Sequence, residues 1–278
     1  MNTPLVSVII PTYNRAWTLK KAIDSVLEQD YKNFELIVVN DGSTDDTEAL
    51  VTEYAKSVKF VQQPNLGVSA ARNKGIQISS GSLISFLDSD DYWEPGKLSA
   101  QVEFFNGNPD ALICQTEETW IRNGKRVTPK QKHKKQSGMI FIPSLALCLV
   151  SPSAVMMRKM LFAKVDVFDE SLPACEDYDL WLRITCRYPV HLIDTPLIVK
   201  TGGHEDQLSS TIGLDKYRIY ALKKILKSDF LTESQFQAAE NMLKKKCRLY
   251  ADGCMKHGRK TVATYYYRLA EELENTVK

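Results

Sequence analysis

Two carboxylates spaced two residues apart, Asp88 and Asp90, have the clearest potential for chemistry in this chain. They follow Leu83–Leu87, a short apolar run typical of a buried strand. Carboxylate oxygens are hard ligands, so such a pair can hold magnesium or manganese against a phosphate more readily than zinc. Asp-x-Asp turns are common on protein surfaces, and the spacing alone is weak evidence. Its place at the exit of an apolar run favours a metal site.

Asp41 is a second candidate, because it ends another apolar run, Phe34–Val39, and precedes Gly42. A carboxylate at the end of a strand can accept a hydrogen bond from a nucleobase or a ribose. The alternative is an aspartate that only forms a turn before the next helix, and the local pattern by itself favours that alternative.

The acidic pair Glu176-Asp177 opens a segment with helical apolar spacing, Asp177–Arg187. Acidic side chains are favourable in the first turn of a helix because they complement the helix dipole. A positioned carboxylate can equally act as a general base, so both roles stay open at this point.

The apolar periodicity predicts alternating strands and helices over the first hundred residues. Strands are expected at Leu5–Ile10, Phe34–Val39, Val58–Val61 and Leu83–Leu87, and helices at Trp17–Leu27, after a cap at Ser43 or Thr44, at Val68–Ile78 and from Pro95 to Phe105. This alternation predicts a mostly parallel sheet with helices on both faces. Polar clusters follow three of the strands, at Pro11–Asn14, Asn40–Ser43 and Asp88–Asp91. Because ligands bind beyond the carboxyl ends of such strands, we expect a binding site at this edge.

The middle of the chain is less regular. Leu112–Ile121 resembles a strand, and Asn123-Gly124 predicts a type I′ hairpin into Lys125–Thr128. The basic stretch around this hairpin is either a solvated loop or a patch for an anionic acceptor or lipid headgroup. Beyond Asp215 only helical patterns remain.

Composition excludes several classes of protein. The chain has 278 residues, of which 44% are hydrophobic and 25% charged, and its net charge of +2 argues against a dedicated nucleic-acid binder. No apolar run approaches the length of a membrane span, and the first residues lack the pattern of a signal peptide. We therefore expect a cytoplasmic protein, with peripheral contact to the inner face of the membrane left open. The glycine motifs of dinucleotide-binding and P-loop enzymes are absent from the sequence.

Five segments of the chain together resemble family 2 glycosyltransferases of the GT-A fold. They are Val6–Arg15, Val39–Thr47, Asn65–Gly75, Phe86–Asp91 and Cys175–Trp181. The likeness covers residues 5 to 105 continuously and returns near 165–210. It implies an α/β fold, the GT-A nucleotide-diphospho-sugar transferase fold, with a Rossmann-like, mostly parallel sheet flanked by helices and a C-terminal helical extension. The implied domains are 1–214, with a nucleotide-sugar-binding half (1–105) and an acceptor half (106–214), and a helical region at 215–278.

The resemblance also implies roles for individual residues. The nucleotide-sugar would be bound by Pro11, Thr12, Tyr13, Asn14, Asp41, Asn65, Arg72, Asp88 and Ser89. Asp41 would accept from the ring N–H of a uracil-type base. A divalent metal, Mn²⁺ or Mg²⁺, would be held by Asp90, with His204 as a further ligand or as an ordinary loop histidine. The segment from Gly202 to Gly213 could close over the donor as a lid.

The implied reaction is an inverting, single-displacement transfer of hexosyltransferase type, with Asp177 as the base and Glu176 beside it. Asp179 competes for that role on chemistry alone.

The expected donor is a UDP-sugar, with dTDP and GDP left open, and the expected acceptor is a glycan or lipid-linked glycan in cell-surface polysaccharide synthesis. A homodimer through the C-terminal helices is a further option. The alternatives are a metal-dependent phosphohydrolase and a non-catalytic nucleotide-sugar-binding or scaffold protein. Trp93 and Trp181 are either sugar-stacking or core residues.

Overall fold

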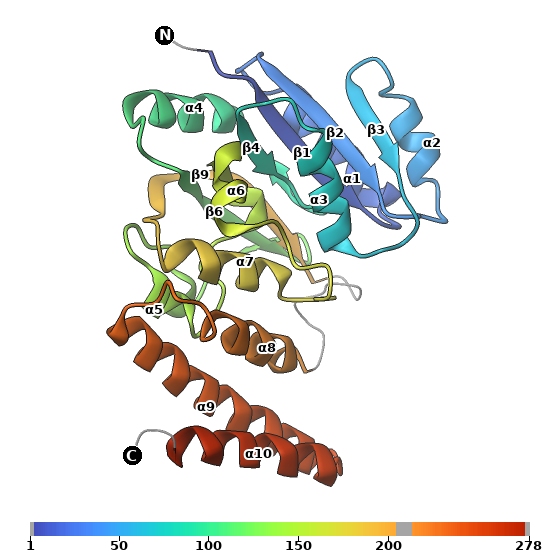
Figure 1. Ribbon diagram of the computed structural model, residues 1–278. Helices are drawn as coiled ribbons and strands as arrows, with labels where there is room; N and C mark the ends of the chain where they lie inside the picture. The colour runs from blue at the N-terminus through green and yellow to red at the C-terminus, as the bar shows by residue number, and fades with distance from the viewer. Residues whose placement is uncertain (1–2, 204–212, 276–278) are drawn as a thin grey trace. The chain divides into compact units, whose positions relative to one another are not determined.

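The computed structural model describes residues 3–203 and 213–275 (Figure 1). The chain divides into two compact units. Unit 1 comprises Met1–Gly138, Leu149–Pro173 and Pro189–His204, and unit 2 comprises Met139–Cys148, Ala174–Tyr188 and Glu205–Lys278.

Unit 1 is built on one mixed sheet. Its strands are β1 (Val6–Thr12), β2 (Phe34–Asn40), β3 (Val58–Gln62), β4 (Leu83–Phe86), β5 (Tyr92–Trp93), β6 (Ile113–Arg122), β7 (Lys125–Val127), β8 (Val155–Arg158) and β9 (His191–Gly202). Over the described residues the strand order is β3-β2-β1-β4-β8-β6-β9-β5, and β7 pairs with β6. The first four strands are parallel, as expected, whereas β8 runs antiparallel to both β4 and β6.

The register of the parallel strands brings their polar carboxyl ends to one edge. Thr12 pairs with Asn40, Asn40 pairs with Gln62, and Ile9 pairs with Phe86. The loops after β1, β2 and β4 therefore start from neighbouring positions. This arrangement confirms the prediction that the polar clusters lie together.

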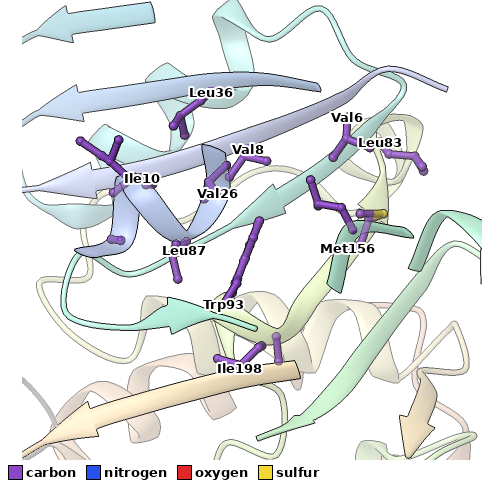
Figure 2. Close-up of a cluster of buried hydrophobic side chains, with 14 of the residues drawn as sticks. Val6, Val8, Ile10, Val26, Leu36, Leu83, Leu87, Trp93, Met156 and Ile198 are labelled. Carbon is purple, nitrogen blue, oxygen red and sulfur yellow. The ribbon is translucent and has the colours of Figure 1, made fainter. Parts of the chain in front are cut away.

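Helices cover both faces of the parallel strands. The helices of unit 1 are α1 (Ala16–Leu27), α2 (Thr47–Thr52), α3 (Val68–Ile78), α4 (Lys97–Gly107) and α6 (Phe162–Val165), with short 3₁₀ turns η1 (Gln131–His133), η2 (Pro152–Ala154) and η3 (Lys159–Leu161). Val8 and Ile10 of β1 lie in a core with Val26 of α1 (Figure 2). Ile9, between them, packs against α3 at Gly75, where a Cβ would lie 2.4 Å from Ile9 Cγ2. Alternate residues of β1 thus meet helices on opposite faces, which the two-sided apolar pattern required.

The predicted cap of the second helix is wrong. The helix α2 begins at Thr47 rather than directly after Ser43 or Thr44. Ser43 Oγ instead accepts from the backbone N–H of Asn14 at 2.9 Å, and Asp45 Oδ2 accepts from the N–H of Ala16 at 3.1 Å. This loop therefore caps α1, whose own N-cap residue makes no side-chain capping bond.

Unit 2 is helical. It contains α5 (Phe141–Ser144), α7 (Glu176–Thr185), α8 (Asp215–Ile225), α9 (Glu233–Lys256) and α10 (Lys260–Asn275). Its core includes Tyr178 from α7, Leu222 from α8 and Leu243 from α9. The longest of these helices, α9, begins with a capping box in which Thr232 and Gln235 bond reciprocally. The predicted C-terminal helical region is confirmed. None of the helices in the described ranges is long and apolar enough to cross a membrane.

Candidate functional site

Asp41 holds the loop that follows β3. Its side chain is buried, and Oδ1 accepts from Gln63 Nε2 at 2.7 Å and from the N–H of Leu66 at 2.9 Å. Oδ2 accepts from the N–H of Gly67 at 2.8 Å. An ionised carboxylate offers about four acceptor positions, of which these donors use three. The geometry therefore leaves Asp41 able to take one further donor while it fixes the loop 63–67.

Gly42 lets this loop approach the end of β2. Its φ is +77°, and a Cβ placed there would lie 2.8 Å from the backbone nitrogen of Asn65. Any other residue would meet both a strained backbone and an overlap. The side chain of Asn65 itself is exposed.

The end of β1 presents two further groups at the same edge. Pro11 and Thr12 are buried, and among the described residues Thr12 Oγ1 has no hydrogen-bond partner. Tyr13 is 46% exposed. Asn14, with φ +51°, accepts from the N–H of Thr44 at 2.7 Å and so ties the first two loops together. Tyr13 is open to a ligand, and Thr12 Oγ1, on the residue before it, is a buried hydroxyl, whereas the carboxamide of Asn14 fixes the loops.

Arg72 on α3 points to Asp88 after β4. Its Nη2 lies 2.7 Å from Asp88 Oδ1, with the arginine side chain 4% exposed and the aspartate 28% exposed. The guanidinium also lies over the ring of Phe168, at 5.2 Å from the centroid. The ion pair places a positive charge inside the acidic turn, and it leaves part of the Asp88 carboxylate accessible.

Asp91 anchors the acidic turn to two distant segments. Its Oδ2 accepts from Ser153 Oγ at 2.7 Å, and its Oδ1 accepts from the N–H of Thr201 at 3.0 Å. Burial raises the pKa of Asp91 well above its ordinary value; Lys200 opposes the rise, and Asp90 adds to it. Asp91 thus holds the turn in place instead of facing a ligand.

Asp90 and Ser89 complete the turn. Ser89 is buried, Asp90 is half-buried, and Thr201 Oγ1 donates to the backbone carbonyl of Asp90. Over residues 3–203 and 213–275, no three His, Cys, Asp or Glu side chains gather into a group that could hold a metal. Magnesium-type ions are commonly held by one or two carboxylates together with substrate phosphates and water, and Asp90 beside Asp88 fits that pattern. His204 lies outside the described residues, as does most of the segment from Gly202 to Gly213.

The two candidate bases in unit 2 differ in their surroundings. Asp179 is buried, and its Oδ2 accepts from both Arg183 at 2.8 Å and Lys224 at 3.1 Å. Asp177 is half-buried, with Oδ1 on the N–H of Tyr178 at 2.7 Å and Oδ2 within 3.3 Å of Cys148 Sγ. Two cations neutralise Asp179, so it serves the packing of α7 against α8.

Glu176, Trp93 and Trp181 are all buried. Glu176 is buried at the start of α7. Trp93 and Trp181 are both buried, and Trp93 Nε1 donates to the carbonyl of Ser153 at 2.9 Å. The core interpretation of both tryptophans is therefore correct.

Three residues of the site were not found from the sequence. Gln63, Ser153 and Thr201 each bond to an aspartate of a strand end, across 22, 62 and 110 residues respectively. Gln63 and Ser153 lie in no motif with recognisable chemistry, and Thr201 begins the glycine-containing segment before His204 without a predicted role of its own. Since local spacing carries no information on such distant partners, only the folded chain could identify them.

Comparison with known proteins agrees with this arrangement. The pattern of the family described as "Glycosyl transferase family 2" matches residues 7–166. An uncharacterized glycosyltransferase of Rickettsia typhi is 34% identical over 242 residues, which is 82% of this chain and 75% of that protein. The Escherichia coli protein named UDP-Glc:alpha-D-GlcNAc-diphosphoundecaprenol beta-1,3-glucosyltransferase WfgD is 33% identical over 189 residues, 66% of this chain and 71% of that protein.

Solved structures show the same fold. S. aureus TarS in complex with UDP-GlcNAc aligns with a TM-score of 0.72 at 20% identity, covering 98% of this chain and 92% of that one. The mannosyltransferase PcManGT from Pyrobaculum calidifontis, in complex with GDP-Man and Mn²⁺, aligns with a TM-score of 0.63 at 16% identity, covering 99% and 88%. With a sheet of this topology and polar side chains at its strand ends, the chain belongs to glycosyltransferase family 2 and is a glycosyltransferase.

Proposed function

We propose that the chain transfers a sugar from a UDP-sugar to a hydroxyl group of a glycan or lipid-linked glycan in cell-surface polysaccharide synthesis. The observation that carries the proposal is the meeting of Thr12, Asp41 and the Asp88–Asp91 turn at one edge of the sheet in unit 1. The names of two similar proteins support the donor and the acceptor class: TarS is described with UDP-GlcNAc, and WfgD is named for a UDP-glucose donor and a diphosphoundecaprenol acceptor.

The uracil base would bind beside Asp41. The carboxylate already fixes the 63–67 loop, and its remaining acceptor position suits the imide N–H of a pyrimidine. Pro11, Tyr13 and Asn65 would frame the nucleotide, and the unpartnered hydroxyl of Thr12 could bond to it. A dTDP carrier presents the same base edge, so the assignment to UDP rests on the similarity to TarS.

A divalent cation, Mn²⁺ or Mg²⁺, would be held by Asp90 in the acidic turn, and His204 is proposed as a further ligand. When bound, such a cation stabilises the charge that grows on a diphosphate leaving group. Asp88 is held by its ion pair with Arg72, and the exposed part of its carboxylate would face the ribose or water at the site. Asp91 keeps the turn in place through Ser153 and Thr201.

The proposed base is Asp177. It would take the proton of the acceptor hydroxyl as the hydroxyl oxygen attacks the anomeric carbon, which inverts the configuration at that carbon. The choice over Asp179 is supported by the two cations that occupy Asp179. Residues 1–105 would bind the donor and 106–214 the acceptor, while the helices of 215–278 could join two copies. The proposed location is cytoplasmic, at the inner face of the membrane.

Titration calorimetry of UDP tests the donor site. We expect UDP to bind in the presence of Mn²⁺ and to lose that affinity with EDTA or in Asp90→Ala. The matched control, Asp110→Ala, removes an exposed carboxylate elsewhere in unit 1 and should leave UDP affinity unchanged. If UDP, dTDP and GDP all fail to bind, the proposed donor site is wrong.

A further inference from the structure

The turn between β6 and β7 and the segment that follows it form a surface on which the charged side chains are all positive. Here the basic hairpin means residues 122–134. Between Thr119 and Gly138 the chain contains no Asp or Glu. Six cations of the basic hairpin are exposed, namely Arg122, Lys125, Arg126, Lys130, Lys132 and Lys134. Within the described ranges, none of the six forms an ion pair with a carboxylate.

The tip of this hairpin has a defined backbone. Asn123 and Gly124 have φ values of +48° and +72°, the two positive values that a type I′ turn requires. Arg122 pairs with Lys125, and Ile121 pairs with Arg126, across the β6–β7 ladder. The turn therefore presents its cations together at the end of a strand pair.

The other end of the basic hairpin is anchored as well. The rings of His133 and Trp120 lie 5.3 Å apart. Lys135 is buried, with Nζ 3.2 Å from Glu118 Oε2 and 3.0 Å from Gln115 Oε1. This ion pair keeps one cation inside the fold and leaves the six others on the outside.

The positive charge of the basic hairpin affects the pKa of His133, which lies within it. Burial lowers the pKa of His133, and the neighbouring charges of Lys132 and Arg122 lower it further, against the opposing effect of Glu118. A dense positive potential attracts either an anionic bilayer or a nucleic acid. Single-stranded nucleic acids also need exposed aromatic rings for stacking, and the aromatic ring of this region, Trp120, packs against His133 and Arg122.

We propose that the basic hairpin docks this chain on the anionic surface of a lipid bilayer. The contact lies in the same unit as the proposed donor site, and it would hold that unit beside acceptors anchored in the membrane. The lysine and arginine charges pair with anionic headgroups at the surface, so no segment needs to enter the hydrocarbon.

Co-sedimentation of the full chain with vesicles tests this proposal. We expect binding to vesicles of equal parts phosphatidylcholine and phosphatidylglycerol, no binding to phosphatidylcholine alone, and a loss of binding as salt is raised. The variant Lys125→Gln/Lys130→Gln/Lys132→Gln should bind about a hundredfold more weakly, since each cation near an anionic surface contributes roughly fivefold.

Two control variants separate charge at this surface from charge in general. Lys32→Gln/Lys56→Gln/Lys59→Gln removes three exposed lysines elsewhere in unit 1 and should bind within about twofold of the parent chain. The triple change of Lys125, Lys130 and Lys132 to Arg should retain binding. Three results would overturn the proposal. They are an equal loss of vesicle binding in the two Gln variants, binding of the parent chain to uncharged vesicles, and binding to single-stranded RNA without binding to vesicles. Because the assay needs no turnover, its outcome is independent of UDP binding.

Discussion

Arg72 and Asp88 form an ion pair of 2.7 Å in which the arginine is buried and the aspartate partly reaches solvent. The pair joins the helix α3 to the turn after β4. A buried guanidinium at this position offsets part of the negative charge of the Asp88–Asp91 turn. The pair therefore has both a structural and an electrostatic consequence.

The two partners of this pair should contribute unequally to the free energy of unfolding. Asp88→Asn leaves the buried guanidinium of Arg72 without this carboxylate, and we expect a loss of about 3 kcal/mol. Arg72→Met removes the buried charge, fills most of its space and leaves only the partly exposed Asp88, so the loss should be about 1 kcal/mol. Urea unfolding of both variants checks the order. A larger loss in Arg72→Met than in Asp88→Asn would contradict the assignment of Arg72 as the buried partner.

Gly42 should tolerate no side chain. In Gly42→Ala the positive φ and the 2.8 Å approach to Asn65 act together, and we expect a loss of about 3 kcal/mol and weaker UDP binding. Gly124→Ala is a matched control, with φ +72° and no atom within 4 Å of the new Cβ. It should lose only about 1 kcal/mol, for the backbone strain. Equal losses in the two variants would show that the overlap with Asn65 is relieved at no cost.

Substitution of Asp177 should affect turnover, whereas substitution of Asp179 should affect the free energy of unfolding. Asp177→Asn is expected to lower kcat about 10²–10⁴-fold while UDP affinity stays within a few-fold. Asp179→Asn should instead lower the free energy of unfolding by about 2–3 kcal/mol, because Arg183 and Lys224 lose their shared partner. Turnover, calorimetry and urea unfolding on the same two variants provide the comparison. Near-normal turnover in Asp177→Asn would exclude it as the base.

Lys97 should make the stability of unit 1 depend on pH. The side chain is fully buried, with Nζ 3.6 Å from the centroid of the Trp93 ring, and burial lowers its pKa well below 10.5. The unfolded chain therefore binds a proton that the folded chain does not hold. The contribution of neutral Lys97 to the free energy of unfolding is complete above pH 10.5. It decreases as the pH falls toward the folded-state pKa of Lys97, by up to about 1.4 kcal/mol per pH unit.

Replacement of Lys97 by methionine tests this linkage. Lys97→Met keeps an unbranched side chain, one atom shorter, and removes the titration, so the variant should show a flatter stability curve from pH 7 to pH 10 and higher stability at pH 7. Lys32→Met, at an exposed site, should leave the slope unchanged. Urea unfolding at several pH values measures both slopes, and parallel curves for the parent and Lys97→Met would contradict the prediction.

Local patterns predicted the parallel half of the fold well. The apolar runs that became β1 to β4 and the spacing of Leu19, Ile23 and Val26 in α1 are short-range properties that need no distant partner. The Asn123-Gly124 turn followed from the backbone preferences of two adjacent residues. Predictions failed where the partner was remote. Thr44 and Ser43 looked like a local cap, yet they bond to the loop after β1.

The sequence by itself determined the family, the order of the elements over the first hundred residues and which acidic residues are candidates for a site, because these depend on residue type and spacing. Only the tertiary structure decided which acids are free for chemistry. It joined Asp91 to Ser153 and Thr201, and it neutralised Asp179 with Lys224. The physical reason is that a carboxylate's role depends on the donors and cations around it, and folding brings those groups from 45 to 110 residues away.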